Sequence, residues 1–189
     1  LVIVQAARFA PQKGQARTLA AAAALREELG DVRVLFVGGG EGEAAVRQQA
    51  EEIGADWATF AGYRDDVPAL LRLADLAVLP SDGEGLPMTL LETVAVGTPI
   101  VATDVGDVRW FVETSGAGSV VSPGDQAGFE SACRELLADA ARRQRIVAAE
   151  AASAMRFDAA TMVRRYEAVF EAAITDAPLP VRLDDDDGR

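Results

Sequence analysis

Two glutamates, Glu84 and Glu92, are spaced so that they could hold different parts of one polar ligand. They lie in residues 81–97, which follow a short apolar run and pass from turn-forming residues to helical spacing. This order predicts a strand, a tight loop and a helix, with Glu84 in the loop and Glu92 in the second helical turn. At about 1.5 Å rise per residue, Glu92 would lie roughly 7 Å beyond the start of the helix, where its carboxylate can accept hydrogen bonds from hydroxyls such as those of a ribose.

The start of the same helix is predicted to bind an anion. Pro87 suits the first helical turn, because its missing N–H would have no partner there, and Gly97 is expected to end the helix. The first amides of a helix are free and carry partial positive charge, so the N–H groups of Gly85, Leu86 and Met88 can bind a phosphate. A phosphate at this end and hydroxyls at the second glutamate together suit a sugar nucleotide.

Two cations, Arg8 and Lys13, follow the first apolar run of the chain. Lys13 is the only lysine, whereas seventeen positions carry arginine, so its use here is informative. Lysine provides a compact, mobile point charge and arginine a planar fork, and one of each in a strand-to-helix loop suits a diphosphate. The alternative is a pair of cations that only face solvent.

The pattern Glu-x7-Glu around Gly-Leu-Pro, together with Arg-Phe-Ala-Pro-Gln-Lys-Gly earlier in the chain, resembles the signatures of the GT4 class of retaining glycosyltransferases, which have a GT-B fold. The resemblance implies that Glu84 faces the transferred sugar and Glu92 holds the nucleotide ribose. It also implies that Arg8 and Lys13 clamp the donor diphosphate and stabilise it as the leaving group. For the glutamates, the alternative is that both are ordinary solvated acids.

A glycine-rich stretch, residues 38–42, follows the second predicted strand. It does not complete the dinucleotide fingerprint G-x-G-x-x-G, because Glu43 stands at the third glycine position, and an NAD site is therefore not favoured. Glycines here more readily allow the loop to approach a ligand or another backbone segment. The family that this chain resembles has a glycine-rich turn at this place, so Gly38 is a candidate ligand contact.

Tyr63 and Arg64 are candidate neighbours of the nucleotide base, because the corresponding loop of the family lies against the base. The alternative is an exposed turn capped by Asp65 or Asp66. These aspartates are adjacent and do not form the D-x-D pattern of metal-dependent GT-A enzymes, so neither a metal ion nor any other cofactor is expected.

A further loop departs from the family pattern. Many members have two glycines followed three residues later by a glutamate, whereas this chain has Gly106, then Asp107, and Trp110 at the glutamate position. The resemblance therefore does not define the ligand contacts of this loop, and the departures could instead reflect a different acceptor.

Composition restricts the remaining function classes. The formal net charge of −12 argues against a nucleic-acid-binding protein, and the absence of histidine excludes a Ser-His-Asp triad and the usual zinc enzymes within this chain. The single cysteine, Cys133, shares a helical face with apolar residues and is expected in the core. No apolar segment is long enough to cross a bilayer, and a cytoplasmic protein is expected.

Strands and helices alternate along the sequence, which predicts an α/β fold, a Rossmann-like parallel sheet of about six strands with helices on both faces, one half of a GT-B fold. Residues 1–175 are expected to form the nucleotide-sugar-binding domain and residues 176–189 a disordered acidic tail. Asp125 is expected to cap the helix that carries Cys133, and a last amphipathic helix is expected over residues 159–174. The expected strands are 1–4, 32–37, 57–60, 76–79, 99–102 and 119–121, and the other expected helices are 16–29 and 43–53.

The resemblance covers only the donor-binding half of a GT-B enzyme. It implies transfer of a sugar from a nucleoside diphosphate sugar to an acceptor hydroxyl with retention, in which a missing N-terminal half binds the acceptor and makes any contact with a membrane surface. The isolated half should bind donor weakly and catalyse little. The alternatives are a non-catalytic module that binds a nucleotide sugar or recruits a partner, and a GT-B epimerase or phosphorylase, whose pyridoxal phosphate would require Lys13.

Overall fold

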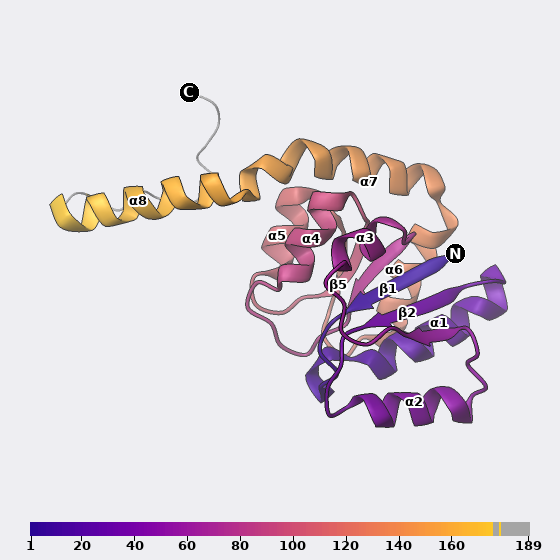
Figure 1. Ribbon diagram of the computed structural model, residues 1–189. Helices are drawn as coiled ribbons and strands as arrows, with labels where there is room; N and C mark the ends of the chain where they lie inside the picture. Colours follow the sequence, from indigo (N-terminus) through magenta and orange to yellow (C-terminus); the bar gives the residue numbers. More distant parts are fainter. Residues whose placement is uncertain (176–177, 179–189) are drawn as a thin grey trace. The chain divides into compact units, whose positions relative to one another are not determined.

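The computed structural model describes residues 1–175 and 178 (Figure 1). The chain divides into two compact units, Leu1–Ser153 and Ala154–Arg189. The predicted domain boundary at residue 175 stays a prediction, and the predicted acidic tail lies outside the described residues except for Pro178. The first unit contains every predicted site residue.

The first unit is built on a parallel sheet of six strands, as predicted, in the order β3-β2-β1-β4-β5-β6. The pairing of β1 with β2 places Val4 opposite Leu35, and the pairing with β4 places Ile3 opposite Leu76. The strands are β1 Val2–Ala6, β2 Arg33–Val37, β3 Ala58–Phe60, β4 Leu76–Leu79, β5 Ile100–Thr103 and β6 Gly118–Val121.

Helices cover both faces of this sheet, as predicted. Figure 1 shows α1 and α2 on one side and α3, α4 and α5 on the other, while α6 packs beside α1 and α7 contacts α4, α5 and α6. The helices are α1 Gln15–Leu29, α2 Glu43–Glu52, α3 Val67–Arg72, α4 Met88–Val96, α5 Val108–Ser115, α6 Gln126–Ala138 and α7 Ala140–Ser153, with a short 3-10 helix, η1, at Pro11–Lys13.

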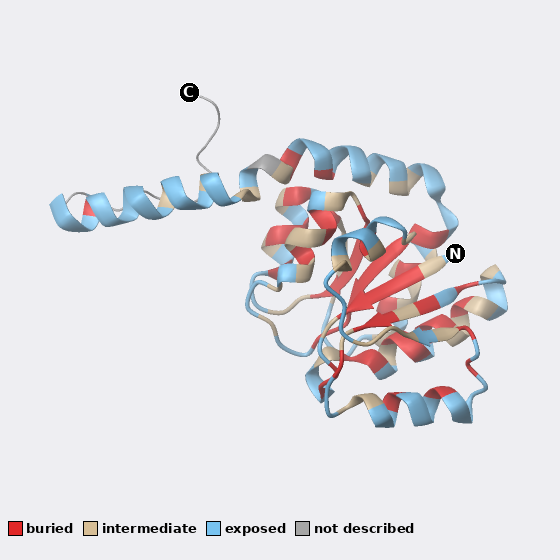
Figure 2. Cartoon of the chain, in the orientation of Figure 1, coloured by how far each residue is buried: buried red, intermediate tan, exposed pale blue. Residues whose placement is uncertain are grey.

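The central strands are buried on both faces, whereas β3 and β6 at the edges are only partly buried (Figure 2). This explains why β4 and the first three residues of β5 are apolar in the sequence, since helices cover both of their faces. An aromatic cluster lies between the sheet and the helices on one side: the ring of Phe36 is 5.9 Å from Phe9 and 5.1 Å from Phe60, centroid to centroid. Phe9 belongs to the loop after β1, so its burial fixes the backbone next to Arg8.

Two local predictions on α6 are confirmed. The Oδ1 atom of Asp125 accepts a hydrogen bond from the N–H of Gly128 over 2.8 Å and caps the helix. Cys133 is buried in the core, and this burial raises the pKa of its thiol.

Some boundaries differ from the predictions. β1 continues to Ala6, two residues beyond the expected end, because Gln5 and Ala6 still pair with β2. The polar Gln5 is buried in the strand and donates from Nε2 to the carbonyl of Lys13 over 2.6 Å. Pro87 is not in the first turn of α4: with φ −71° and ψ 135° it is extended and precedes the helix, which begins at Met88. Gly97 ends that helix in the left-handed conformation, as expected.

The second unit contains a short 3-10 helix, η2 Ala154–Phe157, and the helix α8 Ala159–Thr175. The expected apolar face of α8 includes Met162, Tyr166 and Phe170, which are exposed, and the rings of Tyr166 and Phe170 are 6.3 Å apart. None of the helices described over residues 1–175 combines the length and apolar character that a membrane span requires.

Candidate functional site

The candidate site lies at the carboxyl ends of β1 and β4. From β1 the chain builds the sheet outward through β2 and β3, and from β4 it builds outward in the opposite direction. The two neighbouring loops therefore separate at this point, which is where ligands bind in open parallel sheets. Arg8 and Lys13 follow β1, and Glu84 follows β4.

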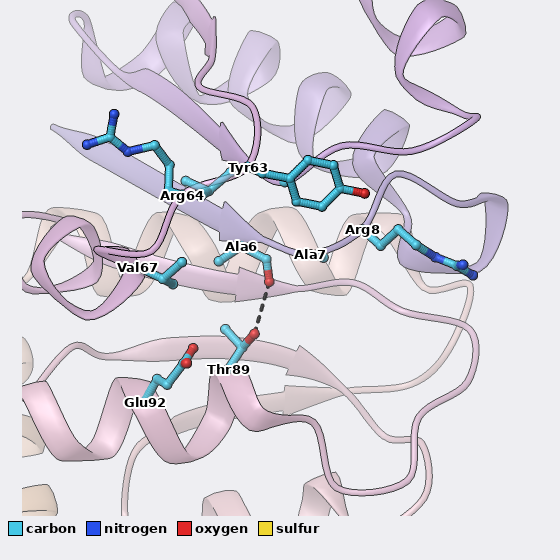
Figure 3. A pocket seen from close by; sticks show the side chains of 10 residues that line it. Ala6, Ala7, Arg8, Tyr63, Arg64, Val67, Thr89 and Glu92 are labelled. Carbon is cyan, nitrogen blue, oxygen red and sulfur yellow. Dashed lines mark hydrogen bonds between the residues drawn. The ribbon is translucent and has the colours of Figure 1, made fainter.

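A pocket of about 230 Å³ opens at this point (Figure 3). It brings together five of the predicted site residues, which come from the ends of three strands and from α4. The pocket is lined by Ala6, Ala7, Arg8, Val37, Gly38, Tyr63, Arg64, Val67, Thr89 and Glu92.

Glu92 is held over the pocket by the attachment of α4 to β1. The Oγ1 atom of Thr89 donates a hydrogen bond to the carbonyl of Ala6 over 2.9 Å, which fixes the first turn of the helix against the strand end. Glu92 stands one turn later and points towards the same strand end (Figure 3). Among the described residues its carboxylate has no hydrogen-bond or ion-pair partner, so both oxygens can accept from a ligand.

Lys13 and Glu84 form an ion pair beside this pocket. Lys13 Nζ lies 2.6 Å from Glu84 Oε1, and the exposed fractions of the two side chains are 21% and 7%. Neither residue lines the pocket itself. The pair nevertheless joins the loop of Arg8 to the loop that leads into α4, so the two predicted motifs meet in space.

The backbones that carry this pair are tied together. The N–H of Asp82 donates to the carbonyl of Gln12 over 2.8 Å, and the guanidinium of Arg17 donates to the carbonyl of Pro80 over 3.0 Å and pairs with Asp82 over 2.6 Å. Gly14 has a φ of 67°, and a Cβ there would lie 2.2 Å from the carbonyl oxygen of Pro80. The close approach of these two loops therefore requires glycine.

The loop after β5 contacts the backbone of the loop that carries Glu84. Gly106 has a φ of 53°, and a Cβ there would lie 2.2 Å from the backbone oxygen of Glu84. The N–H of Asp107 donates to the carbonyl of Gly85 over 3.3 Å. This loop thus positions the glutamate loop through its backbone, a role that the sequence did not reveal.

Tyr63 packs against the glycine-rich turn. Its hydroxyl donates to the carbonyl of Gly39 over 3.2 Å, and a Cβ on Gly39 would lie only 2.6 Å from its ring. The side chain nevertheless remains largely exposed, with Tyr63 78% exposed, so the other side of the ring faces outward. Gly38, with a φ of 128°, brings the turn against the carbonyl of Ala7 at the end of β1.

Arg64 contributes to the pocket wall, but its charged group is engaged elsewhere. Its Nε and Nη2 atoms donate to the two carboxylate oxygens of Asp66 over 2.7 and 2.6 Å. This exposed pair raises the pKa of Arg64 and lowers that of Asp66. Figure 3 shows Arg64 and Arg8 extending in opposite directions. Asp66 precedes α3 but makes no side-chain cap, so the alternative of an aspartate-capped turn is wrong for this residue.

The loop before α4 offers free amides, as the sequence predicts. Within the described part of the chain, the N–H groups of Gly85 and Leu86 donate to no carbonyl or side chain. Both residues are exposed, as is Met88, while Pro87 is partly buried. None of the four lines the pocket, and their contact with a phosphate stays a prediction.

Comparison with known proteins decides the family. Residues 1–139 match the family described as Glycosyl transferases group 1. The chain belongs to this family.

Relatives of this group 1 glycosyltransferase chain are about twice as long. The phosphatidyl-myo-inositol mannosyltransferase of Mycobacterium leprae is 33% identical over 168 residues, which cover 87% of this chain and 44% of that protein. The putative glycosyltransferase EpsD of Bacillus subtilis is 30% identical over 172 residues, which cover 90% and 45%. The chain thus spans less than half the length of these relatives.

A solved structure shows the same fold. The crystal structure of Anabaena Alr3699/HepE in complex with UDP matches with a TM-score of 0.81 and 25% identity, over 90% of this chain and 48% of that one. The six-stranded sheet with helices on both faces is the Rossmann-like half of a GT-B fold, as predicted.

Sequence reasoning missed some residues of this candidate site. Thr89, Val67, the last residue of β1, Ala6, and the next residue, Ala7, line the pocket, although none is charged or belongs to a motif. The position of Thr89, one helical turn before Glu92, offered the only signal, because residues three apart on a helix share a face.

Proposed function

We propose that this chain is the donor-binding half of a retaining glycosyltransferase, which transfers a sugar from a nucleoside diphosphate sugar to an acceptor hydroxyl. The observation that supports this most directly is the single pocket that joins Arg8 to Glu92 at the switch point of the sheet. A cation and an unpaired carboxylate on opposite sides of one cavity suit a ligand with phosphates at one part and hydroxyls at another. The UDP complex of the structural relative is consistent with this choice.

The reaction would be promoted mainly by electrostatics. When the bond between the anomeric carbon and the diphosphate oxygen breaks, negative charge develops on the diphosphate. Arg8, Lys13 and the free amides of Gly85 and Leu86 would stabilise that charge as hydrogen-bond donors. Glu84 would orient the transferred sugar and Glu92 the ribose. The acceptor would be held by an N-terminal half, so this chain alone should turn over little or no donor.

Tyr63 is proposed to contact the nucleotide base. Its ring borders the pocket and has an exposed side on which a planar group can stack. Arg64 is proposed to act there chiefly through its backbone and aliphatic stem, because its guanidinium is paired with Asp66. Stacking is tolerant of base identity, so this contact would secure the base without selecting it.

The proposal is tested by calorimetric titration of the chain with UDP, GDP and ADP and with their sugar conjugates. Arg8→Ala and Lys13→Ala should each weaken binding of the diphosphate more than binding of the corresponding nucleoside. Arg72→Ala is a matched control, because this exposed arginine ends α3 and does not line the pocket, and it should leave the affinity unchanged. Absence of binding to any nucleotide at millimolar concentration would favour a module without donor recognition.

A further inference from the structure

The ion pair between Lys13 and Glu84 joins two groups to which the proposed function gives different parts of the ligand. Lys13 Nζ donates to Glu84 Oε1 over 2.6 Å, and neither side chain has a second polar partner in the part of the chain that the structure describes. The ammonium would bind the diphosphate, whereas the carboxylate would bind the sugar. The two roles are compatible only if a phosphate joins the existing pair or replaces one of its members.

Joining the pair is electrostatically unfavourable. A phosphate bound to the Lys13 ammonium would lie within a few ångströms of the Glu84 carboxylate, and like charges at such a separation repel strongly. The glutamate side chain is only 7% exposed, so water screens this repulsion poorly. The chain also has a formal net charge of −12, which adds an unfavourable background for any anion. Replacement is therefore favoured.

The backbone around the pair restricts how replacement can occur. The hydrogen bond between Asp82 and Gln12 and the tight approach of Gly14 to Pro80 hold the two loops together. The backbone of Glu84 rests on Gly106. Opening of the loops would break these contacts, whereas rotation of the long, partly exposed lysine side chain would break only the ion pair. The exchange is thus confined to side chains.

We propose that Glu84 and an incoming diphosphate are alternative partners of Lys13, so that the diphosphate breaks the ion pair and frees the carboxylate to bind the sugar. The identity of the anion as a diphosphate rests on the proposed function. A largely buried carboxylate that loses its cation is destabilised unless other donors replace it. The sugar hydroxyls would be those donors, so arrival of the diphosphate and orientation of the sugar are coupled through one side chain.

The experiment measures the affinity of the chain for inorganic pyrophosphate by calorimetry. Glu84→Gln keeps the shape of the side chain but removes its charge, so Lys13 becomes available and the affinity should rise at least about fivefold. Glu41→Gln is the matched control: this exposed glutamate lies in the glycine-rich turn after β2, and its removal changes the net charge equally. It should change the affinity by less than about twofold. In a Lys13→Ala background, Glu84→Gln should give no gain.

A second measurement reports on the pair without any ligand. Because Lys13 is the only lysine, isotope-labelled lysine gives a single side-chain NMR signal. Glu84→Gln should shift this signal in the absence of anion and Glu41→Gln should not, and pyrophosphate should shift it in the wild-type chain. A signal insensitive to Glu84→Gln would overturn the inference.

Three other results also overturn the inference: equal affinities of the two glutamine variants for pyrophosphate, weaker binding by Glu84→Gln than by wild type, and no binding by any variant. Weaker binding would mean that the carboxylate supports the anion by holding the ammonium in place. If Glu84→Gln gains affinity for pyrophosphate but no nucleoside diphosphate sugar binds to the wild-type chain, the proposed function fails while the exchange at Lys13 stands.

Discussion

Gly106 lies directly against the backbone oxygen of Glu84, although the two residues are separated by a strand and a helix in the sequence. A Cβ at Gly106 would meet this oxygen at 2.2 Å, and the residue also has a positive φ of 53°. The loop after β5 therefore determines how closely the loop that carries Glu84 can approach the carboxyl end of β5. A residue with no functional group thus controls the position of a candidate catalytic carboxylate.

Gly106→Ala should destabilise the fold and reduce donor affinity together. The left-handed backbone alone costs about 1–3 kcal/mol for a residue with a side chain, and the contact with the carbonyl of Glu84 adds to it. Gly83→Ala is the control in the adjoining loop, because its φ is not restricted to glycine and a Cβ there would meet nothing within 4 Å. Chemical denaturation should show a change within about 0.5 kcal/mol for the control. Similar losses in both variants would contradict the supporting role of Gly106.

Gly39→Ala should disturb nucleotide binding through Tyr63. The added methyl group would lie 2.6 Å from the tyrosine ring and displace it, whereas the backbone at Gly39 needs no positive φ. Tyr63→Ala should weaken nucleotide binding by roughly 1–3 kcal/mol, the usual contribution of one base stacked on an aromatic ring. In the double variant the losses should not add, because both changes remove the same platform. Fully additive losses in calorimetry would show that Gly39 and Tyr63 act separately.

Glu92→Gln should weaken nucleoside diphosphate binding by about 1–3 kcal/mol, because hydrogen bonds from ribose hydroxyls to a carboxylate become bonds to a neutral amide. The loss should be seen with ribonucleotides and be absent with 2′,3′-dideoxynucleotides, which lack these hydroxyls. Calorimetry of the wild-type chain and of Glu92→Gln, each with the ribonucleotide and with the dideoxynucleotide, measures this difference. An equal loss with the dideoxy ligand would show that Glu92 does not contact the ribose hydroxyls.

Glu150, on α7, should make stability fall as the pH rises. Its side chain is buried, its two oxygens have no hydrogen-bond partner among the described residues, and burial raises its pKa from 4.5 to about 8. Between these values the unfolded chain loses the proton while the folded chain keeps it, so the free energy of unfolding decreases through this range and is level outside it. The loss at pH 7 amounts to at most about 3–4 kcal/mol.

Glu150→Gln should remove this part of the pH dependence. Its free energy of unfolding, relative to that of the wild type, should therefore be larger at pH 7 than at pH 4.5. Glu51→Gln, at an exposed site on α2, is the matched control and should leave the curve unchanged. Denaturation curves recorded at several pH values between 4 and 9 measure the effect. A Glu150→Gln curve parallel to that of the wild type would show that the carboxyl does not stay protonated in the folded chain.

Much of the fold could be predicted because strand and helix periods are local properties of the sequence. The apolar runs of β4 and β5 and the turn residues after each strand defined the parallel sheet and placed the candidate residues at one edge. The helices α3, α5 and α7 were not assigned from the sequence; for α3, six residues give too little periodicity. Gln5 concealed the end of β1, because a buried amide inside a strand looks like a loop residue.

Residues of the candidate site could be selected from the sequence where charged side chains occur at a recognisable spacing. Arg8 and Glu92 are examples, and both line one pocket. Contacts that depend on tertiary packing were not accessible in this way. The ion pair between Lys13 and Glu84 spans 71 residues, and no local pattern indicates that the two side chains bind each other. The attachment of Thr89 to Ala6 spans 83 residues and was missed for the same reason.

The position of Lys13 has a practical consequence for any assay of this protein. Apart from the amino group of Leu1, it carries the only primary amine of the chain, and it is paired with Glu84 in the candidate site. Fluorescent dyes, cross-linkers and biosensor surfaces that couple through lysine would attach at the candidate site and obstruct it. Immobilisation through an engineered cysteine on α2 would avoid this lysine, whereas arginine-directed chemistry would modify Arg8 and Arg64 in the pocket wall. A loss of signal after amine coupling would itself report that the ligand binds near Lys13.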